Sequence, residues 1–179
     1  MHNLTDLTEK QISRRSIHKG SVVETVVDEI ILPNGKSAKR EVILHAGGIV
    51  IVPITKEGHF VLVEQYRYPI ETLLLEFPAG RLNPGEDPLK AAYRELAEET
   101  GYRAASIEPL GFIYTAPGFC SEKLYMYVAK GLEEGEQNPD EDEFVKPVLM
   151  SKEELAQKIK NFEIHDAKTL AAWSLVGGQ

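Results

Sequence analysis

The strongest chemical pattern in the sequence lies between Gly80 and Tyr102. On a helix that advances about 100° per residue, Glu95, Glu98 and Glu99 would cluster along one edge. Glu95 and Glu99 are four residues apart, so their like charges repel. A hard divalent cation such as Mg²⁺, which takes oxygen ligands, would offset that repulsion. The alternative interpretation is a solvated acidic face. The pattern combines an arginine with five carboxylates: Arg94, Glu86, Asp87, Glu95, Glu98 and Glu99.

Residues 87–100 are predicted to form the helix that carries most of these carboxylates. Asp87 can cap its first turn, Pro88 suits the first helical position, and Gly101 suits a left-handed stop. The same projection places five less polar side chains on one narrow stripe that is expected to face the core: Leu89, Ala92, Tyr93, Leu96 and Thr100.

The rest of the pattern predicts helices on a mixed sheet, preceded by a small antiparallel β appendage. Residues 22–32 and 40–45 alternate in polarity around a turn at 33–36, which indicates a hairpin. Residues 1–15 are polar and mixed, and the acidic stretch 133–143 is predicted to be a mobile loop. Further strands are expected at 48–54, 59–66, 73–77, 107–114, 123–129 and 144–150, and helices at 152–160 and 167–175.

Composition limits the classes of partner. The net charge of −8 opposes a broad nucleic-acid surface or an anionic-membrane surface. The single cysteine, Cys120, excludes an internal disulfide, and no long apolar run or signal-like start is present. Cytoplasmic residence is therefore expected, and the scattered histidines do not predict a zinc site.

The spacing of the carboxylate region resembles the signature of the Nudix hydrolase family. Five residues separate Gly80 from Glu86, and seven more separate Glu86 from the run 94–101. Tyr102 departs from the pattern, which has an aliphatic residue there. The resemblance implies an α/β (α+β) fold, a Nudix-type α/β/α sandwich with a mixed sheet over residues 46–179. Residues 1–45 would be the appendage. The implied activity is hydrolysis of a nucleoside diphosphate linked to another moiety.

The resemblance also implies a metal site for Mg²⁺, with Mn²⁺ as a possible substitute. Its principal ligands would be the Ala79 carbonyl, Glu95 and Glu99, and Glu98 and Glu86 would assist additional ions. Arg94 would orient the glutamates as part of the catalytic machinery, which also includes Glu98. Gly80 would shape the loop.

Three segments outside the signature resemble the ADP-ribose pyrophosphatase subfamily: residues 64–69, 75–80 and 115–122. The implied reaction gives AMP and ribose 5-phosphate from ADP-ribose. Arg67 would clamp the diphosphate with its planar fork of donors. The other substrate-binding candidates are Arg40, Glu76, Gly80, Pro117, Gly118 and Glu122.

Similar enzymes form a homodimer through the appendage, and Arg40 would then reach the ligand of the partner subunit. Residues 11–45 contain no Phe, Tyr or Trp to stack on adenine, which departs from those relatives. The general base is expected in the acidic loop, where Glu141 and Glu143 are equal candidates. Two other functions stay open: hydrolysis of another nucleoside diphosphate sugar such as GDP-mannose, and nucleotide binding by a non-catalytic Nudix-fold module.

Overall fold

A computed structural model describes residues 6–139, 141 and 143–177, and the chain divides into two compact units. The first unit is Met1–Ala46 with Tyr114–Lys123, and the second is Gly47–Ile113 with Leu124–Gln179. The segment 114–123 thus belongs with the N-terminal residues, although it lies far from them in sequence. Within the described ranges, no helix is long and apolar enough to cross a membrane.

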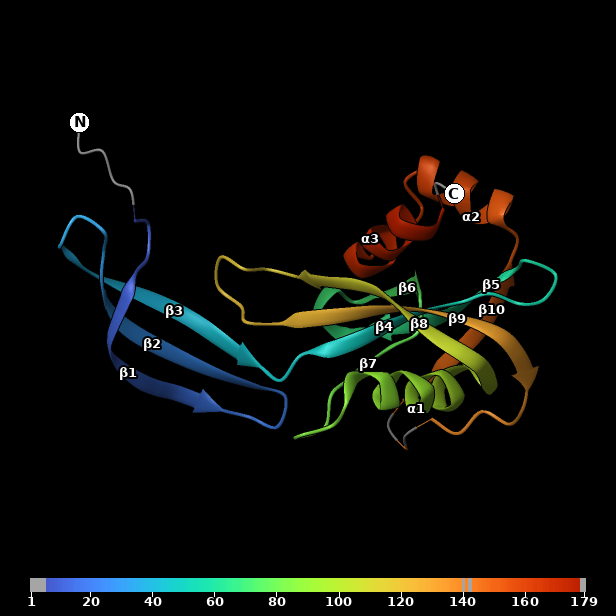
Figure 1. The fold of residues 1–179 in the computed structure, drawn as a ribbon, viewed down its shortest axis with the longest axis horizontal. Helices are drawn as coiled ribbons and strands as arrows, with labels where there is room; N and C mark the ends of the chain where they lie inside the picture. Colours follow the sequence, from blue (N-terminus) through green and yellow to red (C-terminus); the bar gives the residue numbers. More distant parts are fainter. Residues whose placement is uncertain (1–5, 140, 142, 178–179) are drawn as a thin grey trace. The chain divides into compact units, whose positions relative to one another are not determined.

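The first unit is a three-stranded antiparallel sheet in the order β1-β2-β3 (Figure 1). The predicted hairpin is confirmed as β2 (Val23–Ile31) and β3 (Ser37–His45), with Gly35 in the left-handed region of the turn at φ 81°. The strand β1 (Lys10–Lys19) was not predicted. All ten of its residues are exposed, so it carries none of the apolar alternation that marks a half-buried strand.

The second unit contains two sheets. One has the order β7-β4-β9-β8, with β4 parallel to β9 and antiparallel to β7, and the other has the order β10-β5-β6, with antiparallel pairs. This mixture confirms the predicted mixed sheet architecture. The strands are β4 (Gly48–Pro53), β5 (Phe60–Arg67), β6 (Thr72–Glu76), β7 (Ala79–Arg81), β8 (Tyr102–Tyr114), β9 (Lys123–Glu134) and β10 (Val145–Met150).

Helices cover both sides of these strands, as Figure 1 shows for α1 on one side and for α2 and α3 on the other. The helices are α1 (Pro88–Thr100), α2 (Lys152–Lys160) and α3 (Ala167–Val176), with a 3-10 turn η1 (Tyr68–Ile70) after β5. Successive side chains of β4 point to opposite faces of the sheet and enter two different hydrophobic cores. Ile49 and Ile51 pack with residues of α1, and Val50 and Val52 pack with residues of α2 and α3. The predicted α/β/α sandwich is confirmed.

The bounds of α1 follow from its caps. The Asp87 carboxylate accepts hydrogen bonds from the Leu89 and Lys90 amides at 3.1 Å each, and Pro88 occupies the first turn. Gly101 ends the helix at φ 75°, and its amide donates to the Ala97 carbonyl. Both ends of α1 therefore agree with the sequence prediction.

The predicted core stripe of α1 is wrong in part. Leu89 and Tyr93 are 39% and 41% exposed, whereas Glu95 and Glu99 are buried beside Ala92, Leu96 and Thr100. The helix is therefore rotated so that two carboxylates face the protein interior. The physical reason lies on the neighbouring strand β7, where Gly80 leaves room for Glu95 and the Ala79 amide donates to Glu99.

Candidate active site

Two buried carboxylates of α1 face strand β7. Glu95 is 6% exposed and Glu99 is 2% exposed. A Cβ atom on Gly80 would lie 1.8 Å from the Glu95 Cδ atom, so only glycine leaves space for this carboxylate. The Glu99 carboxylate accepts a hydrogen bond from the Ala79 amide at 3.0 Å. The predicted residues Ala79, Gly80, Glu95 and Glu99 therefore meet at one place.

Arg94 collects the other carboxylates of the region. Its Nε and Nη2 atoms donate to the two Glu86 oxygens at 2.9 and 3.0 Å. Its Nη1 atom donates to Glu95 at 2.7 Å and to Glu98 at 2.8 Å. The hydrogen bond from Arg94 and that from the Asn83 amide hold the pKa of Glu86 below its usual range. One guanidinium thus sets the orientation of three carboxylates.

The protonation of the two buried carboxylates differs from that of ordinary glutamates. Burial raises the pKa of Glu99 to about 8, and the charges of Glu95 and Glu143 add to the increase. Burial also raises the pKa of Glu95 to about 7, against the opposing charge and hydrogen bond of Arg94. A positive charge placed between these groups would favour their ionised forms.

The donor set fits a divalent cation that keeps part of its water. Over residues 6–139, 141 and 143–177, no three acidic, histidine or cysteine side chains converge closely enough to hold an ion by themselves. Arg94 instead compensates part of the charge of Glu86, Glu95 and Glu98 through its hydrogen bonds. Magnesium commonly uses one or two carboxylates together with waters and substrate phosphates. Glu95, Glu99 and the Ala79 carbonyl are sufficient for that mode.

A second charged cluster, which we call the clamp, consists of Arg67, Glu76 and Lys168. Glu76 is 1% exposed, and its oxygens accept hydrogen bonds from Arg67 Nε at 2.8 Å and from Nη2 at 2.6 Å. Lys168 from α3 also donates to Glu76. Burial would raise the pKa of Glu76, but Arg67 and Lys168 reverse this and lower it. Glu76 was expected to contact substrate, which stays a prediction; in the structure its buried carboxylate pairs with two cationic side chains of the protein.

The clamp is linked to the start of α3 by residues that sequence reasoning missed. Asp166 caps this helix, accepting from the Thr169 amide at 2.8 Å, and it also accepts from Lys168 at 2.9 Å. The Thr169 hydroxyl accepts from the Phe77 amide at 2.8 Å. The only available signal was the capping pattern at Asp166. It marks a helix start but does not indicate which strand the helix touches.

The two candidates for the general base lie on the connection between β9 and β10. Glu143 is half-buried, and its charge contributes to the raised pKa of both Glu95 and Glu99. Glu141 is exposed. The neighbouring Asp140 and Asp142 fall outside the described residues.

The remaining predicted site residues belong to the first unit. Arg40 forms an ion pair with Glu9 of the same chain. Pro117 and Gly118 are exposed in a turn where the Cys120 amide donates to the Ala116 carbonyl at 2.9 Å. Glu122 accepts from the Thr115 hydroxyl at 2.7 Å and lies 3.4 Å from His45.

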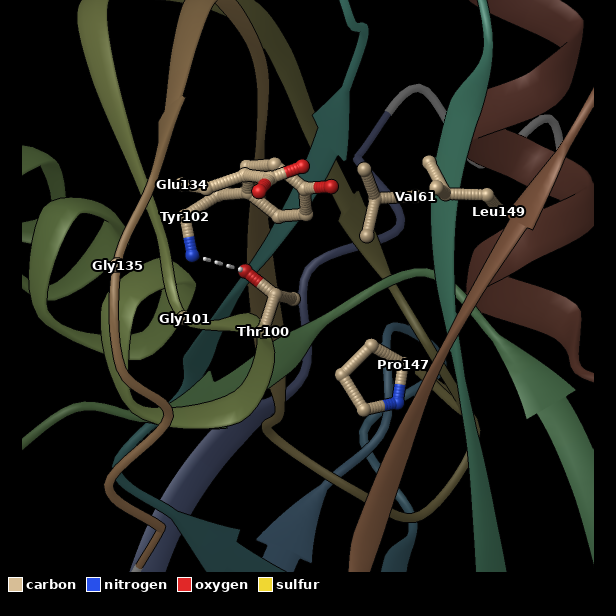
Figure 2. Close-up of a pocket in the computed structure, with 8 residues that line it drawn as sticks. All are labelled: Val61, Thr100, Gly101, Tyr102, Glu134, Gly135, Pro147 and Leu149. Atoms are coloured by element: carbon tan, nitrogen blue, oxygen red, sulfur yellow. Dashed lines mark hydrogen bonds between the residues drawn. The ribbon is translucent and has the colours of Figure 1, made fainter.

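A cavity of about 260 Å³ opens at the C-terminal end of α1 (Figure 2). Figure 2 shows Tyr102 and Glu134 on one side of it and Val61, Pro147 and Leu149 on the other. None of the predicted site residues lines this cavity. The candidate active site is therefore distinct from this cavity.

Comparison with known proteins gives consistent matches. The family model described as "NUDIX domain" matches residues 44–173. A methanol dehydrogenase activator of Bacillus methanolicus is 46% identical, over 92% of this chain and 90% of the relative. An ADP-ribose pyrophosphatase of Bacillus subtilis is 39% identical, over 94% of this chain and 92% of the relative. A crystal structure of an ADP compounds hydrolase superposes with a TM-score of 0.79 at 26% identity, covering 94% of this chain and 91% of that one.

Proposed function

Because the chain belongs to the NUDIX domain family, we propose that it hydrolyses the diphosphate of ADP-ribose to AMP and ribose 5-phosphate, with Mg²⁺ as cofactor. The observation that carries the proposal is the pair of buried carboxylates, Glu95 and Glu99, together with Gly80, which leaves room for Glu95. The 39% identical relative, an ADP-ribose pyrophosphatase, supports the choice of substrate.

Glu95, Glu99 and the Ala79 carbonyl would hold the principal ion, and Glu98 and Glu86 would assist further ions. Mn²⁺ would substitute for Mg²⁺, because both accept carboxylate and water oxygens. A bound divalent cation would supply neutralisation of the charge on the diphosphate. Arg94 keeps the carboxylates in place, since its Nη1 atom contacts Glu95 and Glu98 together.

Arg67 would bind a diphosphate oxygen. Its Nε and Nη2 atoms are directed at Glu76, and among the described residues no hydrogen bond occupies Nη1. The side chain is 37% exposed, so Nη1 is accessible to a ligand. Glu76 and Lys168 act here as positioning residues, because they set the plane of the guanidinium. A fixed planar donor recognises phosphate better than a freely rotating one.

Glu143 would accept the proton of the attacking water. We favour it over Glu141 because its charge contributes to the raised pKa of both Glu95 and Glu99, which supports a role close to these carboxylates. A general base needs to lie within hydrogen-bond reach of the water it activates.

The first unit would complete the site in a homodimer. Strand β1 exposes Ile12 and Ile17, at 57% and 49%, and its outer edge has no partner strand among the described residues. Exposed edges of this kind favour pairing with another chain. Pro117, Gly118 and Glu122 would contact the substrate, and Arg40 would reach the ligand of the partner subunit. Light scattering tests the dimer, and cell fractionation tests the expected cytoplasmic residence.

The experiment that tests the proposed function is hydrolysis of ADP-ribose and of GDP-mannose, each with and without Mg²⁺, with identification of the products. The expected result is Mg²⁺-dependent release of AMP and ribose 5-phosphate from ADP-ribose at the higher kcat/KM. Faster hydrolysis of GDP-mannose would reassign the substrate. Binding of ADP-ribose without turnover would indicate a nucleotide-binding module.

A second candidate function is activation of an alcohol dehydrogenase, because the relative that is 46% identical is a methanol dehydrogenase activator. The test is the rate of methanol oxidation by a purified methanol dehydrogenase with and without this protein. The Glu99→Gln variant separates two routes. Activation that needs hydrolysis is lost in this variant, whereas activation by binding alone is retained.

A further inference from the structure

The first residues of the connection between β9 and β10, 135–138, pack directly against the C-terminal end of α1. A Cβ atom on Gly101 would lie 3.0 Å from the Gln137 amide nitrogen and 3.0 Å from the Gly135 carbonyl oxygen. A Cβ atom on Gly135 would lie 2.9 Å from the Gly101 carbonyl oxygen. Figure 2 shows these two glycines side by side. Glycine at both positions therefore allows the two backbones to approach closely.

Two consecutive residues of this connection bond to the last turn of α1. The Asn138 amide donates to the Glu98 carbonyl at 3.1 Å, and the Gln137 Nε2 atom donates to the Glu99 carbonyl at 2.7 Å. Carbonyls in the last turn of a helix have no partner within the helix. Gln137 and Asn138 thus hold the backbone of the residues whose side chains form the proposed metal site.

The same Gln137 amide makes a second contact. Its Nε2 atom also donates to the Val145 carbonyl at 2.9 Å. Val145 is the first residue of β10, where it pairs with Gln65 of β5. One side-chain nitrogen, with two hydrogens, therefore joins the end of α1 to the start of β10.

Glu143 lies two residues before Val145, so the Gln137 bridge limits where its carboxylate can lie. Glu143 is half-buried, and it stands on the same connection that Gln137 ties to the Glu99 carbonyl. A general base must be held to a fraction of an ångström relative to the groups that bind the reacting diphosphate. The bridge connects the backbone of the metal-ligand helix to the backbone beside this base.

We propose that Gln137 is a positioning residue for hydrolysis, which holds Glu143 in register with the carboxylates of α1 through its two hydrogen bonds. The inference rests on the proposed function, in which Glu143 is the general base. Gln137 does not touch the substrate. Its effect therefore appears in kcat and not in KM, and it disappears when Glu143 can no longer act as a base.

The test is a double-mutant cycle with Gln137→Ala and Glu143→Gln, assayed by steady-state ADP-ribose hydrolysis. Gln137→Ala is expected to lower kcat roughly 10-fold to 100-fold, while KM changes by less than about threefold. Gln137→Glu, which keeps the shape but has no donor, should show the same loss. In the Glu143→Gln background, Gln137→Ala should change kcat by less than about twofold.

The matched control is Gln157→Ala, which removes a glutamine whose Nε2 atom donates to Asn161 at 2.8 Å on α2. This variant should retain the wild-type kcat. Two outcomes overturn the positioning role and leave the proposed function intact: wild-type kcat in Gln137→Ala, or an equal loss with and without Glu143. If Glu143→Gln retains full activity, both the general-base assignment and the positioning role are wrong. If the unmodified protein does not hydrolyse ADP-ribose, the proposed function itself is wrong.

Discussion

Replacing the more buried of the two α1 carboxylates should stabilise the metal-free protein. Glu99 is 2% exposed, and burial raises its pKa to about 8. The Glu99→Gln variant removes this buried charge and keeps the shape of the side chain. It can also keep the hydrogen bond from the Ala79 amide. The expected result is a higher melting temperature at alkaline pH together with nearly complete loss of turnover.

The sign and size of the effect follow from the pKa in the two states. Below the unfolded value of 4.5, both states hold the proton and the group contributes nothing. As pH rises toward about 8, only the folded state keeps the proton, so the wild type loses stability, by about 5 kcal/mol at most above that pH. The new amide costs about 1–3 kcal/mol if its N–H groups lack partners. A net gain of roughly 2–4 kcal/mol is expected, or an increase in Tm of about 5–10 °C.

Thermal unfolding in the absence of divalent metal, at pH 8.5 and at pH 5, measures this effect. At pH 5 the wild-type carboxyl is already protonated in the folded state, so the variant should gain nothing there. Glu98→Gln is the matched control, because that side chain is 28% exposed and should give no such gain. Adding Mg²⁺ at pH 8.5 should raise the Tm of the wild type but not that of Glu99→Gln. A Glu99→Gln protein less stable than the wild type at pH 8.5 would refute the reasoning.

Three other perturbations test the rest of the site. Metal affinity should weaken as pH falls below about 8, by up to tenfold per pH unit for each proton displaced, because protonated carboxylates bind metal poorly. Calorimetric titration between pH 6 and 9 measures this affinity. An affinity that does not change with pH would contradict the metal assignment. Gly80→Ala should abolish Mg²⁺ binding, because the new Cβ atom would lie 1.8 Å from the Glu95 Cδ atom. Titration with Mg²⁺ at pH 8.5 measures this loss. A wild-type affinity in the variant would show that the ion lies elsewhere. Lys168→Met should lower kcat/KM for ADP-ribose about tenfold by releasing Glu76 and Arg67, whereas Lys168→Arg should recover part of it. Equal kinetics for the two Lys168 variants would argue against the clamp.

The parts of the fold that depend on local signals were predictable from sequence. The helix α1 begins and ends where Asp87 and Gly101 indicate, and α2 has the predicted bounds of Lys152–Lys160. Strand β1 was not predictable in this way, because it is held only by pairing with β2 and has no buried face. Strand β9 runs to Glu134, beyond the predicted end at residue 129, because it continues into the acidic stretch that was expected to be a loop.

The site residues likewise divide into those that the sequence pattern predicts and those that only the fold brings together. The spacing of Glu95 and Glu99 on one helix predicts that they lie together. The contact between α1 and β7 then brings them together with Gly80. Lys168 and Gln137 act across 92 and 38 residues of sequence, on Glu76 and on the Glu99 carbonyl, so only the fold brings each to its partner. An isolated lysine or glutamine has no spacing pattern that reveals such a contact.

The attachment of Glu76 and Phe77 to α3 has a consequence for biosynthesis. Lys168 and Thr169, which bond to them, follow all of the described strands in chain order. A ribosome therefore makes the carboxylates of α1 well before the residues that hold the clamp. Domains tend to fold as units while the chain emerges. The domain that contains the proposed metal site can therefore complete its fold only after Lys168 and Thr169 have emerged, so the clamp should be among the last features to form.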